Sequence, residues 1–464
     1  MGVRYGIESA IFVALYLVFL LMVGLRLFRK VKTDADEYLV MGRKLSLPAF
    51  VASIVSTWYG GILGVGVYSF KYGLSNWLVF GLPYYLSAFL FAMFLAKRAQ
   101  VSRHYTIPDQ LNLAYGKSVS IVGASFVFLT AVPSAYILQV GILAENVFGI
   151  PLVIGVVAGA FFSIFYIFSG GLRGDIITDI AQFALMFLGF IVMLVFLATH
   201  YGGLDFLQAH VPAVNFTWKG TKSASYIFVW YFIALATLVE PSFYQRCFAA
   251  KTPSTARRGI LLAIPFWALF DFLTTSTGLY ARALMPDLAD PVSSYPALGA
   301  LVLPGALQGL FLVGMFATVM STVDTYSFVA GTTLGRDIIL RLKKGALNNG
   351  ANITLYSRLG LVASAGLAIA IALYFKSVID IWYVFGTIGT CALMVPLASS
   401  FSDRLRMRPK MAMASIICST VVVLIWLVPN IILGKSFFFG LDPIYPGLAT
   451  SLGMWGWDRL TRSK

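Results

Sequence analysis

Long apolar runs recur along the whole sequence, and they constrain the fold more than any other feature. Runs of about 20 apolar residues alternate with short polar connectors. A helix of about 20 apolar residues is long enough to cross a bilayer, whose hydrocarbon core is about 30 Å thick. The 464 residues are 59% hydrophobic and only 11% charged, which excludes an ordinary soluble globular protein. We therefore predict an all-α, multi-pass membrane protein.

The positions of the runs predict thirteen transmembrane helices. Their ranges are 7–28, 47–71, 75–97, 119–148, 150–169, 174–199, 224–246, 257–282, 300–333, 356–375, 379–401, 410–433 and 439–458. Alternate connectors are rich in Lys and Arg, such as RLFRKVK (26–32) and RLRMRPK (404–410). The positive-inside rule places these in the cytosol, so we expect the N-terminus outside and the C-terminus in the cytosol. Because the net charge of +15 flanks the spans, we predict lipid contact and no nucleic-acid binding.

Two of the predicted spans carry signals of an interruption. The second contains four glycines within FVASIVSTWYGGILGVGVYSF (50–70), and they follow Ser56 and Thr57. The seventh contains Glu240 before Pro241, and proline removes a backbone donor and clashes with the preceding turn. A broken helix frees backbone carbonyls that can ligate a cation, which is how many transporter sites are built.

The two interrupted spans lie five helices apart, which predicts two halves of five helices each. An odd repeat length inverts the second half relative to the first, as in many secondary transporters. We place the halves at 47–199 and 224–401, with one extra helix at 7–28 before them and two at 410–458 after them. The expected organisation is one transporter domain over 1–464. No nucleophile–base pair or cofactor loop is recognisable, so we predict that the protein is not an enzyme.

A polar cluster interrupts the ninth run, which includes MFATVMSTVDTYSFVAGTTLGRD (315–337). Helical spacing directs its oxygens to one neighbourhood; they belong to Thr318, Ser321, Thr322, Asp324 and Thr325. These hard oxygen ligands favour an alkali or alkaline-earth cation. A carboxylate at membrane depth costs about 2.5–3.5 kcal/mol, and we find no lysine or arginine within a span to pair with it. We therefore expect a bound cation beside Asp324.

Other acids lie in or near predicted spans. Asp179 and Asp175 belong to GGLRGDIITDIAQF (170–183), and we expect Asp175, one turn nearer the cytosol, to be solvated. Asp271 lies in the eighth span. Titration of Asp324, Asp179 or Asp271 would make the protein a proton-coupled carrier, and this alternative stays open.

Five segments together resemble the sodium:solute symporter family. They are DEYLVMGRKLS (36–46), GGLRGDIITDIAQ (170–182), QRCFAAKTPSTARRG (245–259), ATVMSTVDTYSFVAGTTLGRDI (317–338) and GLDPIYPGLATSL (440–452). The resemblance covers nearly the whole chain and implies a LeuT-type fold of two inverted five-helix repeats. It also implies sodium-coupled import of a small polar solute by alternating access, in a plasma membrane. The compact loops favour a bacterial inner membrane.

The resemblance implies two ion sites. In the first, the backbone carbonyls of Val55, Trp58 and Thr318 join the hydroxyls of Ser321 and Thr322 around a sodium ion. In the second, found in some members, a further sodium ion or a proton lies between Asp179, Ser321, Asp324 and Thr325. Asp324 departs from the serine that is frequent there, so the sodium-to-solute ratio stays open, as does the oligomeric state.

The substrate is expected between the two interruptions. The implied residues are Ser56, Thr57, Tyr59, Gly60, Glu240, Ser242 and Tyr383. The stretch from Ser56 to Gly61 looks like the break in choline-transporting members, and the rings of Trp58 and Tyr59 could offer cation–π faces with Glu240 as counter-charge. This favours an organic cation or zwitterion, although the two rings could instead only pack. A sugar, polyol, carboxylate or neutral amino acid remains an alternative.

Overall fold

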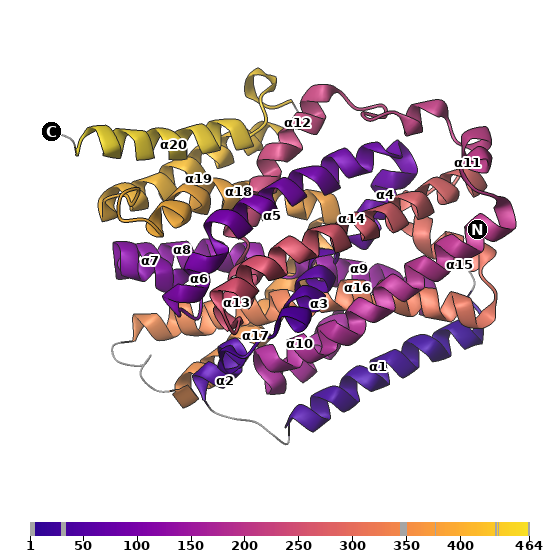
Figure 1. Ribbon diagram of the computed structural model, residues 1–464, viewed down its shortest axis with the longest axis horizontal. Helices are drawn as coiled ribbons and strands as arrows, with labels where there is room; N and C mark the ends of the chain where they lie inside the picture. Colours follow the sequence, from indigo (N-terminus) through magenta and orange to yellow (C-terminus); the bar gives the residue numbers. More distant parts are fainter. Residues whose placement is uncertain are drawn as a thin grey trace.

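A computed structural model of the chain describes residues 5–28, 34–343, 350–375, 377–431, 434 and 436–462. Parts of the predicted first connector, at 29–32, and of the predicted span 410–433, at 432 and 433, lie outside these residues. The long helices run side by side, close to the horizontal in Figure 1. Across the described ranges every element is a helix, apart from one isolated β-bridge between Leu45 and Ala250. The predicted all-α class is therefore confirmed.

The first part of the chain forms the peripheral helix and the first set of core helices. These elements are α1 (Ile7–Phe28), α2 (Ala35–Val40), η1 (Met41–Arg43), α3 (Leu47–Trp58), α4 (Ile62–Tyr72), η2 (Trp77–Gly81), α5 (Leu82–Phe94), α6 (Ala96–Ser102), α7 (Ile107–Tyr115), α8 (Lys117–Ala131), α9 (Ser134–Phe148) and α10 (Leu152–Tyr201). Short helices α11 (Leu204–His210) and η3 (Ala213–Phe216) follow.

The second part of the chain supplies the remaining helices. They are α12 (Ala224–Ile233), η4 (Ala234–Val239), α13 (Pro241–Ala249), α14 (Pro253–Leu284), η5 (Pro291–Ser293), α15 (Ser294–Val302), α16 (Gly305–Thr332), η6 (Thr333–Leu340), α17 (Gly350–Phe375), α18 (Val378–Ser400), α19 (Pro409–Ile431), η8 (Phe438–Gly440) and α20 (Ile444–Leu460). Among the described residues, ten helices are long and apolar enough to cross a membrane, or eleven if the bent pair α3–α4 is one span.

Helix α10 contains 50 residues but is not one straight rod. At 1.5 Å per residue it would be about 75 Å long, far more than the hydrocarbon core of a bilayer. It turns at Gly171, whose φ is 53°, a conformation that favours glycine. A methyl group at Gly171 would also lie 2.5 Å from the carbonyl oxygen of Tyr38. Glycine is therefore required there both by the backbone turn and by the close contact with α2.

Helix α16 forms the centre of the bundle. Within Gly305–Leu340, 83% of the most apolar 18-residue segment is buried inside the protein. The corresponding segment of α1 is only 28% buried. Every residue from 311 to 332 is buried, and α16 packs along α10, α1 and α17. The polar cluster at 318–325 therefore lies inside the protein and not against lipid.

Both predicted interruptions are breaks in the structure. Helix α3 ends at Trp58, and α4 leaves it at an angle of 60°. The second break lies between η4 and α13, where Glu240 precedes Pro241. The start of α3 and the end of α13 lie next to each other, because Leu45, just before α3, and Ala250, just after α13, form the β-bridge. Backbone hydrogen bonds from Leu45 to Ala249 and from Lys251 to Leu45 measure 3.1 and 3.0 Å.

Candidate functional site: an oxygen-lined ion site beside an aromatic cavity

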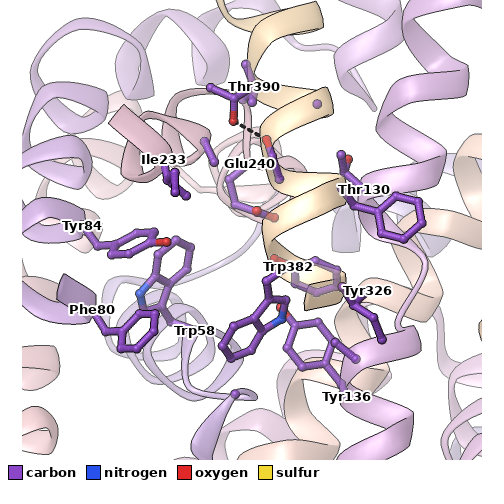
Figure 2. A pocket seen from close by; sticks show the side chains of 18 of the residues that line it. Trp58, Phe80, Tyr84, Thr130, Tyr136, Ile233, Glu240, Tyr326, Trp382 and Thr390 are labelled. Atoms are coloured by element: carbon purple, nitrogen blue, oxygen red, sulfur yellow. Dashed lines mark hydrogen bonds between the residues drawn. The ribbon is translucent and has the colours of Figure 1, made fainter. Parts of the chain in front are cut away.

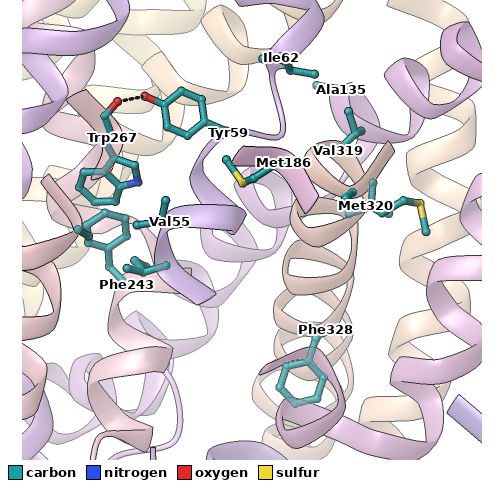
Figure 3. Close-up of a cluster of buried hydrophobic side chains, with 14 of the residues drawn as sticks. Val55, Tyr59, Ile62, Ala135, Met186, Phe243, Trp267, Val319, Met320 and Phe328 are labelled. Atoms are coloured by element: carbon teal, nitrogen blue, oxygen red, sulfur yellow. Dashed lines mark hydrogen bonds between the residues drawn. The ribbon is translucent and has the colours of Figure 1, made fainter. Parts of the chain in front are cut away.

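The break between α3 and α4 packs directly on α16. A helix that ends at Trp58 leaves the carbonyl groups of its last turn without intrahelical partners. A methyl group at Gly60 would lie 2.2 Å from the hydroxyl oxygen of Thr322, so only glycine permits this approach. Figure 3 shows Val55 on α3 beside Trp267 and Phe243, with Met186 between it and Val319 of α16. The close contact brings the free carbonyls of α3 within reach of α16 hydroxyls.

Two hydroxyl groups of α16 donate hydrogen bonds into the last turn of α3. Ser321 Oγ lies 2.9 Å from the Ser56 carbonyl oxygen, and Thr322 Oγ1 lies 2.7 Å from the Thr57 carbonyl oxygen. Ser321 Oγ is also 3.0 Å from the carbonyl oxygen of Thr318. Three carbonyls and two hydroxyls thus meet at a fully buried point. All are hard oxygen donors, which suits a cation such as sodium and disfavours zinc or copper.

The carbonyls that these hydroxyls contact are the neighbours of the predicted pair. Val55 and Trp58 flank Ser56 and Thr57 in the same turn, and Val55 is fully buried there. Sodium coordination by the Val55 and Trp58 carbonyls stays a prediction. The contacts of the α16 hydroxyls with the broken helix are observed directly in the geometry.

Arg246 of α13 lies buried beside this point. Its guanidinium is 2.8 Å from an Asp175 oxygen and 3.1 Å from an Asp179 oxygen. It also donates to the hydroxyl of Thr325 at 2.6 Å and to the hydroxyl of Ser53 at 3.0 Å. Arg246 and both acids have no exposed side-chain surface. One cation therefore ties together α3, α10, α13 and α16.

Two expectations from the sequence are wrong at this cluster. Asp175 is completely buried, although we expected it to be solvated. Arg246 is a cation in the protein core, although we expected no arginine or lysine within the spans. The reason is the break before Pro241: it makes α13 a half-helix, so a residue near the end of an apolar run lies in the interior. The guanidinium then reaches both acids of α10 from one position.

Asp324 faces α10 and α1 instead of α13. It accepts hydrogen bonds from the hydroxyl of Ser163, at 2.7 Å, and from that of Tyr166. On α10, the amide of Gln182 donates to the Tyr16 hydroxyl of α1 at 2.9 Å. In the described part of the chain, no basic side chain lies within salt-bridge distance of Asp324. Its described hydrogen-bond donors are therefore neutral.

A cavity of about 190 Å³ lies between the two broken helices. Its walls are largely aromatic, and Figure 2 shows several rings around one common space. The rings that line it come from Trp58, Tyr59, Phe80, Tyr84, Tyr136, Trp230, Tyr326, Trp382 and Phe385. Trp58 is fixed by edge-to-face contacts with Tyr84 and Phe243, whose ring centroids are 5.6 and 5.1 Å away. The aromatic walls are therefore packed into defined positions.

Two carboxyl groups also line this cavity. Glu240 caps α13 by accepting the backbone N–H of Ser242 at 3.2 Å, and Pro241 begins the helix with a φ suited to its first position. The Glu240 side chain stands beside the cavity in Figure 2. Asp271 of α14 is the second acid, and it accepts a hydrogen bond from the Tyr85 hydroxyl. The cavity therefore combines aromatic faces with negative charge.

The structure separates the predicted substrate residues into two groups. Tyr59 and Glu240 line the cavity, as does Trp58. The others do not line it. The Ser56 hydroxyl donates to Ser53, the Thr57 hydroxyl pairs with Thr325, Gly60 packs on Thr322, Ser242 lies behind Glu240, and Tyr383 donates to Asp442 at 2.6 Å. Successive residues of a helix point about 100° apart, so α18 presents Trp382 to the cavity and turns Tyr383 away.

Sequence reasoning missed most of the cavity wall. Tyr84, Tyr136, Trp382 and Tyr326 come from α5, α9, α18 and α16, and each resembles any other aromatic residue of a span. Asp271 gave a usable signal as an acid inside an apolar run, but its position relative to Glu240 could not be deduced from spacing.

Similarity to known proteins agrees with this architecture. The sequence model of the sodium:solute symporter family matches residues 38–419. The sodium/pantothenate symporter of Escherichia coli (strain K12) is 24% identical over 459 residues, which cover 94% of this chain and 93% of that protein. The sodium/proline symporter of Staphylococcus aureus (strain JH9) is 24% identical over 476 residues, covering 96% and 91%.

Solved structures show the same fold. A Na⁺-coupled sialic acid symporter in an outward-open state superposes with a TM-score of 0.80 at 15% identity, covering 98% of both chains. The nucleobase-cation-symport-1 family transporter Mhp1, with bromovinylhydantoin bound, superposes with a TM-score of 0.57 at 12% identity, covering 93% and 95%. These likenesses establish a LeuT-type fold. With the family match over most of its length, the chain belongs to the sodium:solute symporter family.

Proposed function

We propose that the protein imports a small organic cation or zwitterion together with sodium, by alternating access across a bacterial plasma membrane. The observation that carries this proposal is the meeting of α16 hydroxyls with α3 carbonyls at a buried helix break. The ion in this proposal lies among Val55, Trp58, Thr318, Ser321 and Thr322. Membership of the family supports sodium as the coupling ion.

The proposed topology is a single domain of thirteen spans. It divides α10 at Gly171, joins the bent pair α3–α4 into one span and includes the 17-residue α20. The repeats at 47–199 and 224–401 are related by inversion, and the distribution of basic connectors supports an outside N-terminus and a cytosolic C-terminus. Accessibility labelling of single cysteines introduced in the 200–223 and 251–256 connectors tests the orientation.

Coupling follows from the shared position of the ion and the break. A bound sodium ion would hold the last turn of α3 against α16 and so fix the adjoining residues that line the cavity. Substrate would then bind more tightly, and by linkage sodium would bind more tightly with substrate present. One sodium ion gains about 2.3 kcal/mol per 100 mV and about 1.4 kcal/mol per tenfold gradient. Together these could sustain roughly a 500-fold gradient of a neutral solute.

The cavity supports a positively charged solute. Aromatic faces attract an ammonium group, and Glu240 adds a carboxylate with no basic partner within salt-bridge distance among the described residues. No arginine, lysine or histidine lines the cavity in the described ranges, which disfavours a simple organic anion. A thermal-shift screen with sodium, across amines, amino acids, sugars and carboxylates, tests this class. Larger stabilisation by carboxylates than by amines would refute it.

A second cation site at Asp179, Asp324 and Thr325 stays a proposal. Arg246 already supplies positive charge to Asp179 and Thr325, whereas Asp324 has only neutral donors. Asp179→Asn should lower the sodium-to-solute ratio if a second ion binds there, and an unchanged ratio would remove that site. Uptake driven by a pH gradient without sodium would instead favour the proton-coupled alternative.

The first ion site has a direct test. Ser321→Ala with Thr322→Ala removes both hydroxyls, so we expect a higher sodium concentration at half-maximal uptake. A hydroxyl oxygen that coordinates sodium is a polar contact to a charged group, which is worth about 1.5–3 kcal/mol, so the shift should reach at least roughly tenfold. Ser327→Ala is a matched control, because Ser327 is a buried hydroxyl of the same helix outside the site. An equal sodium dependence in the double variant and the control would refute the assignment.

A further inference from the structure

The cavity is lined by two acids, one more than a single ammonium group would pair with. Glu240 and Asp271 both line it, from the second helix break and from α14. Neither acid has a basic partner within salt-bridge distance in the described residues. Arg246, the nearest buried guanidinium along the chain, is engaged by Asp175 and Asp179. Two carboxylates therefore face one cavity without a built-in counter-charge.

Asp271 is held in place for a ligand by neutral groups only. The residue is 1% exposed and accepts a hydrogen bond from the Tyr85 hydroxyl, whereas the Tyr59 hydroxyl donates to the Trp267 carbonyl oxygen at 2.8 Å. Tyr85 also receives the indole N–H of Trp77 at 3.1 Å, so the tyrosine is itself fixed. A methyl group at Gly81 would lie 3.0 Å from the Asp271 carboxylate, so the chain packs closely around it. Neutral donors orient a buried carboxylate but leave its charge uncompensated.

The charge and the walls together define a ligand class. A buried carboxylate is strongly unfavourable while it is ionised and unpaired, so each of these acids must bind either a proton or a cation that the cavity admits. An ammonium group paired with each acid would satisfy both, and the methylene chain between two such groups would lie within the aromatic walls of the cavity. Cations over such rings gain further cation–π attraction. A volume of about 190 Å³ accommodates a short, unbranched chain.

We propose that the substrate is a dication of the α,ω-diamine class, with one ammonium group on Glu240 and the other on Asp271. This inference rests on the proposed function, because it concerns the substrate of the same cavity. Asp271 is then the residue that distinguishes a diamine from a monoamine. The second charge also adds to the driving force, since each positive charge gains about 2.3 kcal/mol per 100 mV on moving inward.

The test compares 1,4-diaminobutane with n-butylamine in proteoliposomes containing the full chain, under an inward sodium gradient. The diamine should bind about 10- to 100-fold more tightly, the range expected for one additional charged hydrogen bond. It should also carry one more positive charge per solute than butylamine, measured as the charge-to-flux ratio at a clamped potential. Asp271→Asn should weaken diamine binding about 10- to 100-fold more than butylamine binding, and so abolish the preference for the diamine.

Asp442→Asn is the matched control, because Asp442 is another acid bound to a tyrosine but lies outside the cavity. It should preserve the preference. Equal affinity for both amines in the wild-type protein, or an equal loss of both in Asp271→Asn, would overturn the dication assignment. If Asp271→Asn fails to fold, the wild-type comparison and its charge-to-flux ratio still decide. Sodium-driven uptake of some other solute would sink only this inference, whereas no sodium-driven uptake of any solute would sink the proposed function as well.

Discussion

Arg246→Met should show how strongly one buried cation holds the transport core together. The cluster of Asp175, Asp179 and Arg246 carries a net charge of −1 when all three are ionised, and none of the three has exposed side-chain surface. Methionine has a similar length and no charge, so the variant leaves two buried carboxylates without a basic partner. It also removes the donors to the hydroxyls of Ser53 and Thr325.

The expected loss is large for a single substitution. Removing one partner of a buried ion pair typically costs about 3–5 kcal/mol. A chain of this length has an unfolding entropy of about 1 kcal/mol per degree on the scale of globular proteins, so the unfolding midpoint should fall by about 3–5 °C. The assay is thermal unfolding of the purified protein in one detergent, at saturating sodium.

A double-mutant cycle separates charge from packing. Asp175→Asn in the Arg246→Met background restores the net charge of −1, so the double variant should be less destabilised than the sum of the two single changes. Coupling energies of contacting residues are about 0.5–3 kcal/mol. Arg173→Met is a control, because Arg173 pairs with Glu37 while 39% exposed, and exposed pairs contribute about 0–1 kcal/mol. If the two losses at Arg246 and Asp175 simply add, the charge-balance reasoning is wrong.

Two further predictions concern the cavity wall and the buried charges outside the spans. Gly61→Ala places a methyl group 1.6 Å from the ring of Trp382 in α18. We expect this overpacking to lower the free energy of unfolding by about 1–3 kcal/mol and to raise the KM for the transported solute. Gly366→Ala is the control and should be neutral, because a methyl group there meets nothing within 4 Å among the described residues. Burial alone raises the pKa of Asp109, but the guanidinium groups of Arg336 and Arg341 overcome this and hold it below its usual value. A carboxyl whose pKa is lowered by folding stabilises the fold at pH values above its unfolded pKa of about 3.9. Asp109→Asn should therefore lower the unfolding midpoint at pH 7. The difference between this variant and the wild type should shrink as the pH falls below about 4. A constant difference from pH 7 to pH 3 would contradict this assignment.

The features that sequence could predict are those encoded by neighbouring residues. Gly60 and Gly61 mark the first break, and Glu240 before Pro241 marks the second, because each pair changes the local backbone. The hydroxyls of Ser321 and Thr322 were placed near the first break only by the resemblance to the sodium:solute symporter family. Local signals therefore predicted the breaks, and the resemblance predicted the helix that packs on one of them.

The features that sequence could not predict depend on contacts between distant residues. Arg246 and Asp175 are 71 positions apart, and neither position differs in local pattern from a helix end near solvent. The aromatic wall is similar: Tyr136 and Trp382 pack with ring centroids 6.1 Å apart, although they belong to α9 and α18. Apolar spans contain many aromatic residues, so composition alone does not distinguish those that line a cavity from those that contact lipid.

The break in α3 explains how two cations could be coupled without touching each other. Ser56 and Thr57 turn their carbonyls to the α16 hydroxyls, while the next two residues, Trp58 and Tyr59, line the cavity. Four successive residues would therefore serve both proposed sites, and ordering this segment at one site would lower the entropic cost of ordering it at the other. Such coupling acts through the backbone of one helix turn, so it requires no shared ligand. It follows that a substitution that loosens the turn without removing an oxygen should weaken sodium and substrate binding together.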